Sequence, residues 1–396
     1  MEIRLARSLR ELRLRASPAY ELILFDRLSP AEQQDLAGLE RDPDGYGILR
    51  PRHDPRLSIK SASRDMALLW FTLQSPAVLP RYVRQTLGEQ CDQVIGQMVL
   101  DGVLAVEVNG ELVSGPGART FVCADRPESG PEGCLAALSR RALEYAEALE
   151  ITDALELSAR LYNYNHLPVS PEWRRRLCDQ AAVEHHLGID HGATARLLER
   201  GWQRLPPAGP GRGWIAWQSQ PMRDNHSAPT TYKLYVSPAF SQVRAAFQVT
   251  ADATALSKAF HLKVGRDAYG LLRPDKIVVY FREFCELQET AARILQNLER
   301  CPAHGVPFTA EIAGAGLLSW GIDPPEEKNS VAWLERESWR QRICNQLGTA
   351  LSLAKVSTQS EILAWRFAMD RLRLEGIDTE TWAPTRALAW AGPSRR

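Results

Sequence analysis

The stretch AFHLKVGRDAYGLLRPDKIVVYFR, residues 259–282, gathers side chains that can move protons and bind anions. It holds His261, Lys263 and Lys276, together with three arginines. The chain has 48 Lys plus Arg, yet only seven are lysines, and four of these lie between positions 233 and 276. Arginine stays protonated and grips phosphate with its planar fork, whereas lysine can act as a base when burial or neighbouring cations lower its pKa. Lysine at these positions therefore indicates proton removal beside a bound anion.

Strand alternation places part of this set on one face of a predicted sheet. In HLKVG, His261 and Lys263 share one face, and the apolar residues next to them share the other. In TTYKLYVSP (230–238), Lys233 falls on the face opposite Leu234. Because adjacent strands lie roughly 5 Å apart, Lys233, His261 and Lys263 could converge on one site. The cations that follow in the next loop and strand are Arg266, Arg273, Lys276 and Arg282.

These residue types together fit β-elimination of phosphate. Cationic side chains would hold the phosphate, Lys263 would remove a proton from carbon, and a protonated His261 would protonate the departing group. That reaction requires neither a metal nor a cofactor. The alternative is an ordinary sheet face on which acids neutralise the cations, and three acids are available nearby. They are Asp267, Asp275 and Glu283. Residue types alone leave both interpretations open.

Other motifs point away from metal, nucleotide or hydrolase chemistry. The candidate metal ligands in EHHLGIDHG (184–192) are His185, His186, Asp190 and His191. Adjacent histidines on a helix point about 100° apart, and no HExxH is present, so we expect a solvated helix end and no metal site. GPGRG (209–213) lacks the lysine of a phosphate loop, and GAGLLSWG (314–321) lacks the GxSxG elbow. No cofactor is expected.

Composition narrows the class of partner and compartment. The formal net charge is +0, with 48 acidic against 48 basic residues, which disfavours broad attraction to nucleic acid or to an anionic membrane. The seven cysteines form no CxxC pair and indicate no disulfide framework. Residues 1–25 have the pattern of an amphipathic helix rather than a signal peptide. We therefore expect a soluble cytoplasmic protein.

Two Pro/Gly-rich stretches, 124–133 and 204–213, divide the chain into segments 1–123, 134–203 and 214–396. In the first segment, helical periodicity over 80–102 precedes Asn109-Gly110, a strong hairpin signal. A helix followed by a hairpin is typical of a winged-helix unit. Such a unit could recognise nucleic acid, pair with a peptide strand or serve only structure. Few basic residues follow Arg84 on the helix, which argues against DNA, whereas a peptide could add to the hairpin edge.

The other two segments predict helices and then an α+β domain. The middle segment is helical. The last segment alternates short β-branched or aromatic runs with helical periods. Strands are expected at 214–220, 231–238, 260–265, 275–281 and 306–313. Helices are expected at 241–260, 283–301, 334–356 and 358–375. The prediction is an antiparallel or mixed sheet with packed helices, following a helical N-terminal region with a winged-helix-like unit.

Several short stretches carry a resemblance to a known family. They are ARLYNYNHLPV (159–169), TYKLYVSP (231–238), FHLKVG (260–265), RPDKIVVYF (273–281), HGVPFTAEIA (304–313) and EGIDTETWAP (375–384). Their order and spacing over about 155–384 resemble the HopA-type effector domain of plant-pathogen type III effectors and of bacterial peptide-modifying gene clusters. Proteins of the latter kind act as class V lanthipeptide lyases, which eliminate phosphate from phosphoserine or phosphothreonine to give dehydroalanine or dehydrobutyrine.

The resemblance implies a carbon–oxygen lyase acting on a ribosomal precursor peptide, with a kinase and a cyclase as pathway partners. It implies Lys263 as base and His261 as acid, and Lys233 is the other candidate base. Lys233, Arg266, Arg273, Lys276 and Arg282 would contact phosphate. Tyr232, Tyr235 or Tyr280 could assist. Residues 1–123 would help to capture the leader peptide. The alternative is a peptide- or protein-binding adaptor without chemistry.

Overall fold

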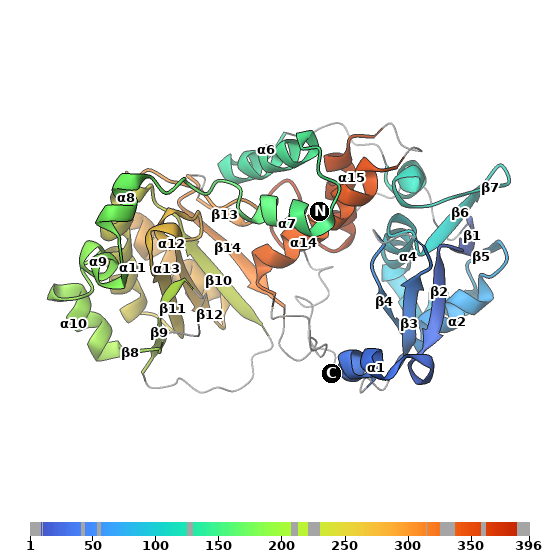
Figure 1. Cartoon of the computed structure of the whole chain (residues 1–396), viewed down its shortest axis with the longest axis horizontal. Coiled ribbons are helices and arrows are strands. Elements are labelled where there is room, and N and C mark those ends of the chain that lie inside the picture. The colour runs from blue at the N-terminus through green and yellow to red at the C-terminus, as the bar shows by residue number, and fades with distance from the viewer. Residues whose placement is uncertain are drawn as a thin grey trace.

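A seven-stranded antiparallel sheet carries the stretch 259–282 (Figure 1). The computed structural model describes residues 9, 11–40, 44–53, 57–124, 130–206, 213–220, 230–313, 315–324, 337–357 and 362–385. The strand order is β13-β14-β10-β12-β11-β9-β8. The strands are β8 (Trp202–Arg204), β9 (Trp214–Ser219), β10 (Thr231–Val236), β11 (His261–Gly265), β12 (Ile277–Phe281), β13 (Ala310–Ile312) and β14 (Leu318–Asp323). The predicted α+β class is confirmed, and every neighbouring pair is antiparallel.

Helices cover one face of this sheet. Leu234, Val264 and Val279 point into a buried cluster, which they share with α11 and α13. The alternation of β10 and β11 is the cause, since it sends every second side chain to this face. The helices around the sheet are α8 (Pro171–Arg176), α9 (Gln180–Leu187), α10 (Gly192–Gly201), α11 (Val243–Ala255), α12 (Ala268–Leu272) and α13 (Phe284–Asn297). The 3-10 turn η4 (Phe240–Gln242) precedes α11.

The N-terminal part contains two small sheets. One has the order β5-β1-β6-β7, and the other β2-β3-β4. The strands are β1 (Arg13–Ala16), β2 (Tyr20–Leu24), β3 (Gly45–Pro51), β4 (Lys60–Ser63), β5 (Ala77–Val78), β6 (Leu104–Val108) and β7 (Glu111–Val113). The helices are α1 (Pro30–Glu40), α2 (Arg64–Thr72), α3 (Arg81–Leu87), α4 (Cys91–Leu100) and α5 (Arg119–Val122), with 3-10 turns η1 (Phe25–Arg27), η2 (Gly88–Gln90) and η3 (Gly115–Ala118).

The amphipathic helix expected over residues 1–25 is wrong for the described part of that range. Two strands, β1 and β2, occupy it instead. Leu14 and Ala16 are buried while Arg13 is exposed, which is the two-residue period of a strand. Pro18, which lacks a backbone N–H, lies between the two strands and disfavours a continuous helix.

The hairpin predicted at Asn109-Gly110 is confirmed. It joins β6 to β7, and both turn residues have positive φ angles, 51° and 85°, as a type I′ turn requires. The helix expected over 80–102 forms as two helices, α3 and α4, because the chain turns at Gly88, where φ is 53°. The winged-helix interpretation stays a prediction.

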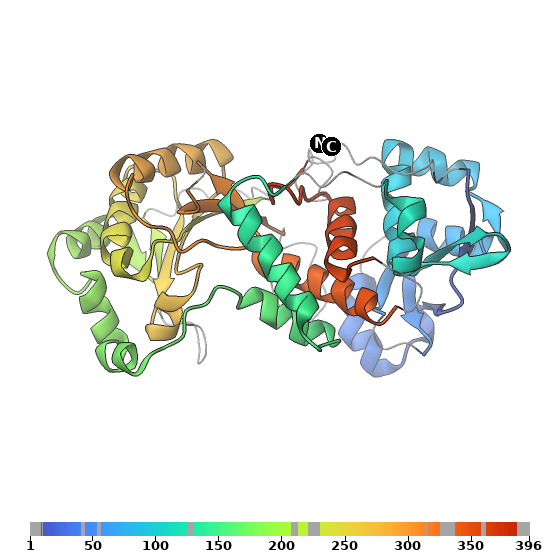
Figure 2. The same ribbon diagram turned by 90° about the horizontal axis from the view of Figure 1, so that it is seen from above.

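Four helices lie between the large sheet and the N-terminal sheets (Figure 2). They are α6 (Cys134–Ala148), α7 (Ala154–Tyr162), α14 (Trp339–Lys355) and α15 (Ala364–Leu374). One buried cluster joins Leu347 of α14 and Phe367 of α15 to Ile95 of α4 and Leu104 of β6. The C-terminal helices thus share a core with the N-terminal part. The division at 123, 134, 203 and 214 stays a prediction.

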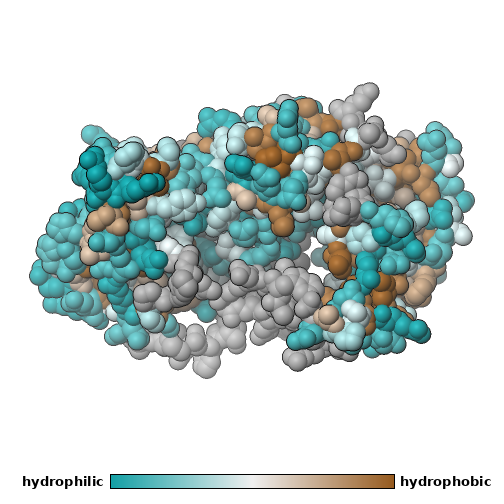
Figure 3. Space-filling model, in the orientation of Figure 1, coloured by the Kyte–Doolittle hydropathy of each residue, from teal (hydrophilic) through white to brown (hydrophobic). Residues whose placement is uncertain are grey.

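The surface is uneven in polarity. On the face shown in Figure 3, the end with α9 and α10 is mostly hydrophilic, and apolar surface is visible over the N-terminal part. Ile59, Leu68, Phe71 and Val78 of that part are exposed. None of the helices in the described part of the chain combines the length and the apolar content that crossing a membrane requires.

Candidate functional site

Strand register brings three predicted site residues to one aromatic ring. Tyr280 of β12 lies opposite His261 on one side and opposite Lys233 on the other. The ring centroid of Tyr280 is 4.7 Å from that of His261 and 5.1 Å from Nζ of Lys233. Nζ of Lys263 lies 5.4 Å from the same centroid. The convergence expected from alternation is therefore present, and Tyr280 is at its centre.

Among the described residues, Lys263 has aromatic neighbours but no counter-ion. It is half-buried, and its Nζ lies 4.2 Å from the ring centroid of Trp214. It forms no ion pair or hydrogen bond within the described ranges. Burial lowers the pKa of Lys263 to about 7, and the positive charge of Lys233 adds to this effect. Near neutral pH the amine is thus poised to accept a proton.

Lys233, by contrast, has a buried counter-ion. Its Nζ lies 2.6 Å from Oδ2 of Asp323, and the residue is 4% exposed. The other oxygen of Asp323 accepts a hydrogen bond of 2.8 Å from the backbone N–H of Trp339, at the first turn of α14. The ion pair fixes the position of the Lys233 amine beside this carboxylate.

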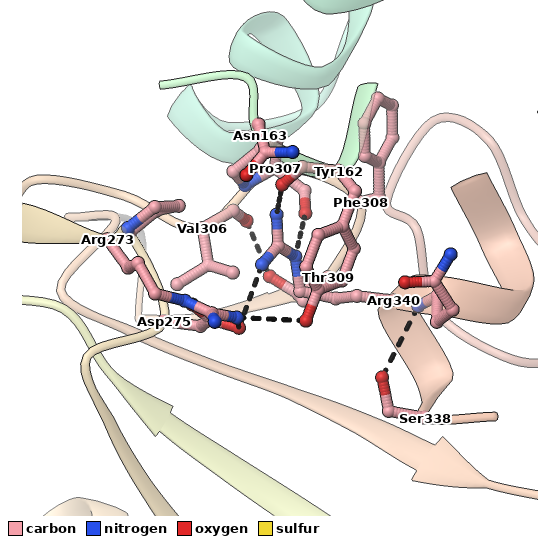
Figure 4. A network of polar contacts seen from close by, with 12 residues as sticks. Tyr162, Asn163, Arg273, Asp275, Val306, Pro307, Phe308, Thr309, Ser338 and Arg340 are labelled. Carbon is pink, nitrogen blue, oxygen red and sulfur yellow. Dashed lines mark hydrogen bonds and ion pairs between the residues drawn. The ribbon is translucent and has the colours of Figure 1, made fainter. Parts of the chain in front are cut away.

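A buried network fixes Arg273 at the site (Figure 4). Nε and Nη2 of Arg273 donate to the two oxygens of Asp275 at 2.8 and 2.9 Å, and Nη2 also donates to the Tyr162 hydroxyl at 2.9 Å. Nη1 of Arg340, a residue 1% exposed, lies 2.9 Å from Oδ2 of Asp275. Although burial opposes ionisation, the two guanidiniums hold the pKa of Asp275 well below its usual range. The guanidinium of Arg273 stacks 5.0 Å from the ring centroid of Trp214 and keeps 19% of its side chain exposed.

Lys276 is placed differently from the prediction that it contacts phosphate. It is 0% exposed, and its Nζ donates 3.0 Å to the carbonyl of Pro238 and lies 2.7 Å from Nδ1 of His304. Nε2 of His304 is 2.6 Å from the Asn165 carbonyl oxygen, which can only accept, so Nε2 carries the proton and Nδ1 accepts from Lys276. Burial lowers the pKa of Lys276 to about 7 and that of His304 to about 4. No substrate phosphate can reach Lys276 in this arrangement.

The remaining predicted cations lie at the margin. Nη1 of Arg282 donates 3.0 Å to the Thr231 hydroxyl, and its guanidinium stacks 4.3 Å from the centroid of Phe260. Arg266 follows β11 and is half-buried, and its side chain has no ion pair or hydrogen bond with a described residue. The structure brings neither guanidinium into contact with Lys263.

The three predicted tyrosines divide between the two faces. Tyr232 lies on the helix-covered face, 5.5 Å from the ring centroid of Phe284, and so points away from Lys263. Tyr235 and Tyr280 lie on the face of Lys263. Tyr235 is buried, and burial raises its pKa well above the usual value. Tyr280 is the tyrosine of the three that contacts the lysines.

Acids neutralise part of the face, as the alternative interpretation required. Asp275 pairs with Arg273, whereas Asp267 accepts a hydrogen bond of 2.7 Å from the backbone N–H of Gly270 and so caps α12. Asp323 pairs with Lys233. Lys263 remains without a counter-ion among the described residues, so acids do not neutralise every cation on this face.

Sequence reasoning missed several residues of the site. Asp323 could have been found, because LSWGID alternates and would have put it on the face of Ser319 had 318–323 been assigned as a strand. Tyr162 lies inside the stretch 159–169. Arg340 gave no signal, since a single arginine in a helical pattern is ordinarily exposed.

The histidine cluster forms at the turn between α9 and α10. Nδ1 of His185 and Nδ1 of His191 each lie 2.9 Å from an oxygen of Asp190. The ligand-type atoms of the three lie within 4.8 Å of one another and could hold a metal ion, but all three residues are exposed. His186 instead stacks on Phe240, with ring centroids 5.6 Å apart. The hydrogen bonds account for the arrangement by themselves.

Known proteins show only distant likeness. No protein-family model and no curated protein matches the chain. The effector protein from Pseudomonas syringae pv. tomato strain DC3000 aligns at a TM-score of 0.38 and 13% identity, over 63% of this chain and 98% of its own. The effector protein from Pseudomonas syringae pv. syringae strain 61 aligns at a TM-score of 0.37 and 12% identity, over 65% of this chain and 99% of its own. The type III effector/phosphothreonine lyase OspF from Shigella flexneri aligns at a TM-score of 0.27 and 15% identity, over 39% of this chain and 85% of its own. At such values the likeness assigns this chain neither a family nor an activity.

Proposed function

We propose that the protein is a lyase that eliminates phosphate from phosphoserine or phosphothreonine of a peptide. The observation that carries the proposal is Lys263, an amine with a pKa of about 7 that has no counter-ion in the described structure and lies among cations. A general base works best when its pKa lies near the operating pH. The surrounding cations suit a dianionic phosphate, whose charge they would offset.

The elimination balances without a further reactant. The Lys263 amine takes the α-proton of the phosphorylated residue, and the electron pair of that C–H bond forms the Cα=Cβ double bond. The Cβ–O bond breaks, and its electrons leave with the phosphate. His261, in its protonated form, gives a proton to the departing phosphate oxygen. The products are a dehydroamino acid and inorganic phosphate.

The two lysines near Tyr280 take different roles in this scheme. Lys233 is paired with Asp323 and supplies a fixed positive charge, while Lys263 supplies the lone pair. Arg273 reaches the site with its remaining amino group, Nη1, available to a phosphate oxygen. Its other nitrogens, Nε and Nη2, are bound by Asp275 and Tyr162.

The substrate in this proposal is a ribosomal precursor peptide phosphorylated by a separate kinase, and a cyclase would use the dehydroamino acids to build a lanthipeptide. The N-terminal part would bind the leader segment. Its four-stranded sheet ends in β7, which among the described strands pairs only with β6, so the outer side of β7 offers an edge to an added strand. A winged-helix role for 80–115 fits this mode of binding.

Mass spectrometry of a phosphothreonine peptide incubated with the protein tests the proposal. We expect loss of one phosphoric acid per site and addition of a thiol to the new double bond. Lys263→Ala should abolish both, and Lys233→Ala should weaken them through poorer phosphate binding. Unchanged phosphopeptide that still binds the protein would contradict a lyase and favour an adaptor. Full activity of Lys263→Ala would contradict the assignment of the base.

A further inference from the structure

The first turn of α14 contacts both carboxylates of the candidate site. The backbone N–H of Trp339 donates 2.8 Å to Asp323, and Arg340 lies 2.9 Å from Asp275. Each carboxylate has one site cation as its other partner, Lys233 for Asp323 and Arg273 for Asp275. Two consecutive residues of one helix therefore each contact one of the two acids. Figure 4 shows the Arg340 side of this arrangement.

We infer that the first turn of α14 is a positioning element for the base, because by engaging Asp275 and Asp323 it keeps either carboxylate from becoming the counter-ion of Lys263. The inference rests on the proposed function. It adds a regulatory point to that function, since movement of this turn would remove one partner from each of the two acids and strengthen their field at the amine.

The turn is held by contacts that reach beyond the site. The indole N–H of Trp339 donates 3.0 Å to the carbonyl of Phe308, and Nη2 of Arg340 donates 2.9 Å to the carbonyl of Tyr162. Farther along α14, Leu347 and Leu351 lie in the buried cluster shared with the N-terminal part. The helix thus connects the core of the N-terminal part to the acids of the site.

Charges on every neighbouring element bear on Lys263. Lys233 of β10 and Arg273 of the loop before β12 disfavour its ammonium form, whereas Asp275 and Asp323 favour it. Other titratable residues described on this face include His261, Tyr235 and Tyr280. Removing the charge of Arg340 leaves Asp275 with a single cationic partner, so its field at Lys263 grows. The amine should then hold its proton to a higher pH.

Competitive acetylation of the full chain, read by mass spectrometry at each lysine, measures this titration without any elimination. In the unaltered protein we expect Lys263 to label with a midpoint near pH 7. In Arg340→Met the midpoint should rise by about one pH unit, and in Arg340→Lys it should not move. Exposed Lys258, which pairs with Glu286, is the internal reference and should titrate identically in all variants.

Asp275→Asn tests the same inference without leaving a buried anion unpaired. Its Lys263 midpoint should fall, also by about one unit, because an attractive charge is lost. A midpoint that stays fixed in either folded variant would overturn the inference while leaving the lyase proposal intact. A midpoint in the ordinary lysine range in the unaltered protein would instead remove the base from the proposed function. Thermal unfolding of each variant shows which of them are folded.

Discussion

Lys263 of β11 and Lys276, which directly precedes β12, each have a pKa lowered to about 7, chiefly by burial. Their surroundings differ. Lys276 is closed in by the carbonyl of Pro238 and the imidazole of His304, whereas Lys263 faces the rings of Trp214 and Tyr280 and keeps partial exposure. A lowered pKa records burial. A base also needs a lone pair that a substrate can reach.

The histidines of the two regions differ in the same way. His304 is tied at both ring nitrogens, to Lys276 and to the Asn165 carbonyl, and its pKa is lowered to about 4, mainly by burial. His261 lies against the ring of Tyr280 in the row that contains Lys233. The region around Lys276 therefore has the character of a structural polar network, and the region around Lys263 that of a reaction site.

Exchanging each lysine for methionine is the strongest way to break this comparison. Lys263→Met should lower kcat for phosphate elimination by about 100- to 10,000-fold, the range typical of a lost general base. Lys276→Met should keep kcat within about threefold but destabilise the fold by roughly 1–3 kcal/mol, because a carbonyl and an imidazole lose their buried donor. Single-turnover elimination and urea unfolding measure the two effects. An equal loss of kcat in both folded variants would show that the regions do not differ in function.

The two histidines give a smaller contrast. His261→Gln should lower kcat by roughly 10- to 100-fold, because the departing phosphate loses its proton donor. His304→Gln should leave kcat nearly unchanged, since its ring nitrogens face Lys276 and a backbone carbonyl. Elimination rates at saturating phosphopeptide separate this effect from binding. A larger loss in His304→Gln would move the acid to the other region.

Part of this contrast is predictable from the sequence. Alternation in HLKVG and TTYKLYV places His261, Lys263 and Lys233 on one side of the sheet, and the structure brings them to Tyr280. Alternation cannot show that Lys276 is enclosed, because Lys276 directly precedes β12 and the distant His304 is one of the residues that close it in. Contacts between residues far apart in the chain decide which lysine is reachable.

For the fold as well, local patterns were predictable from the sequence and contacts between distant residues were not. Strands with a clear two-residue period, such as β10 and β11, were predictable, and so was the Asn109-Gly110 hairpin. The strands β1 and β2 were mistaken for a helix because short apolar spacings fit both periods. The contact of Arg340 with Asp275 joins residues 65 positions apart by number and depends on how α14 docks, which no local pattern encodes.

The smallest expected effect is a pH dependence of stability that the Lys276 region contributes without affecting catalysis. The pKa of Lys276 is about 7 in the folded state and about 10.4 in an unfolded chain, so between these values the unfolded state binds more protons. The free energy of unfolding should therefore rise as the pH increases from 7 toward 10, and this gain should be lost again as the pH falls from 10 to 7. In Lys276→Met that part of the rise, on the order of 1–2 kcal/mol, should disappear.

Urea unfolding at pH 7, 8 and 9 measures this rise, with Lys258→Met as the matched control at an exposed lysine. The control should keep the full rise. Lys263→Met should lose a comparable part of it, because the pKa of Lys263 is lowered in the same direction, yet it alone should also lose elimination. Both lysines would then lose a proton on folding because their pKa values fall, but only Lys263 would accept a proton from a substrate. If Lys276→Met keeps the full rise, burial does not lower the pKa of Lys276. The two regions would then not share a lysine with a lowered pKa.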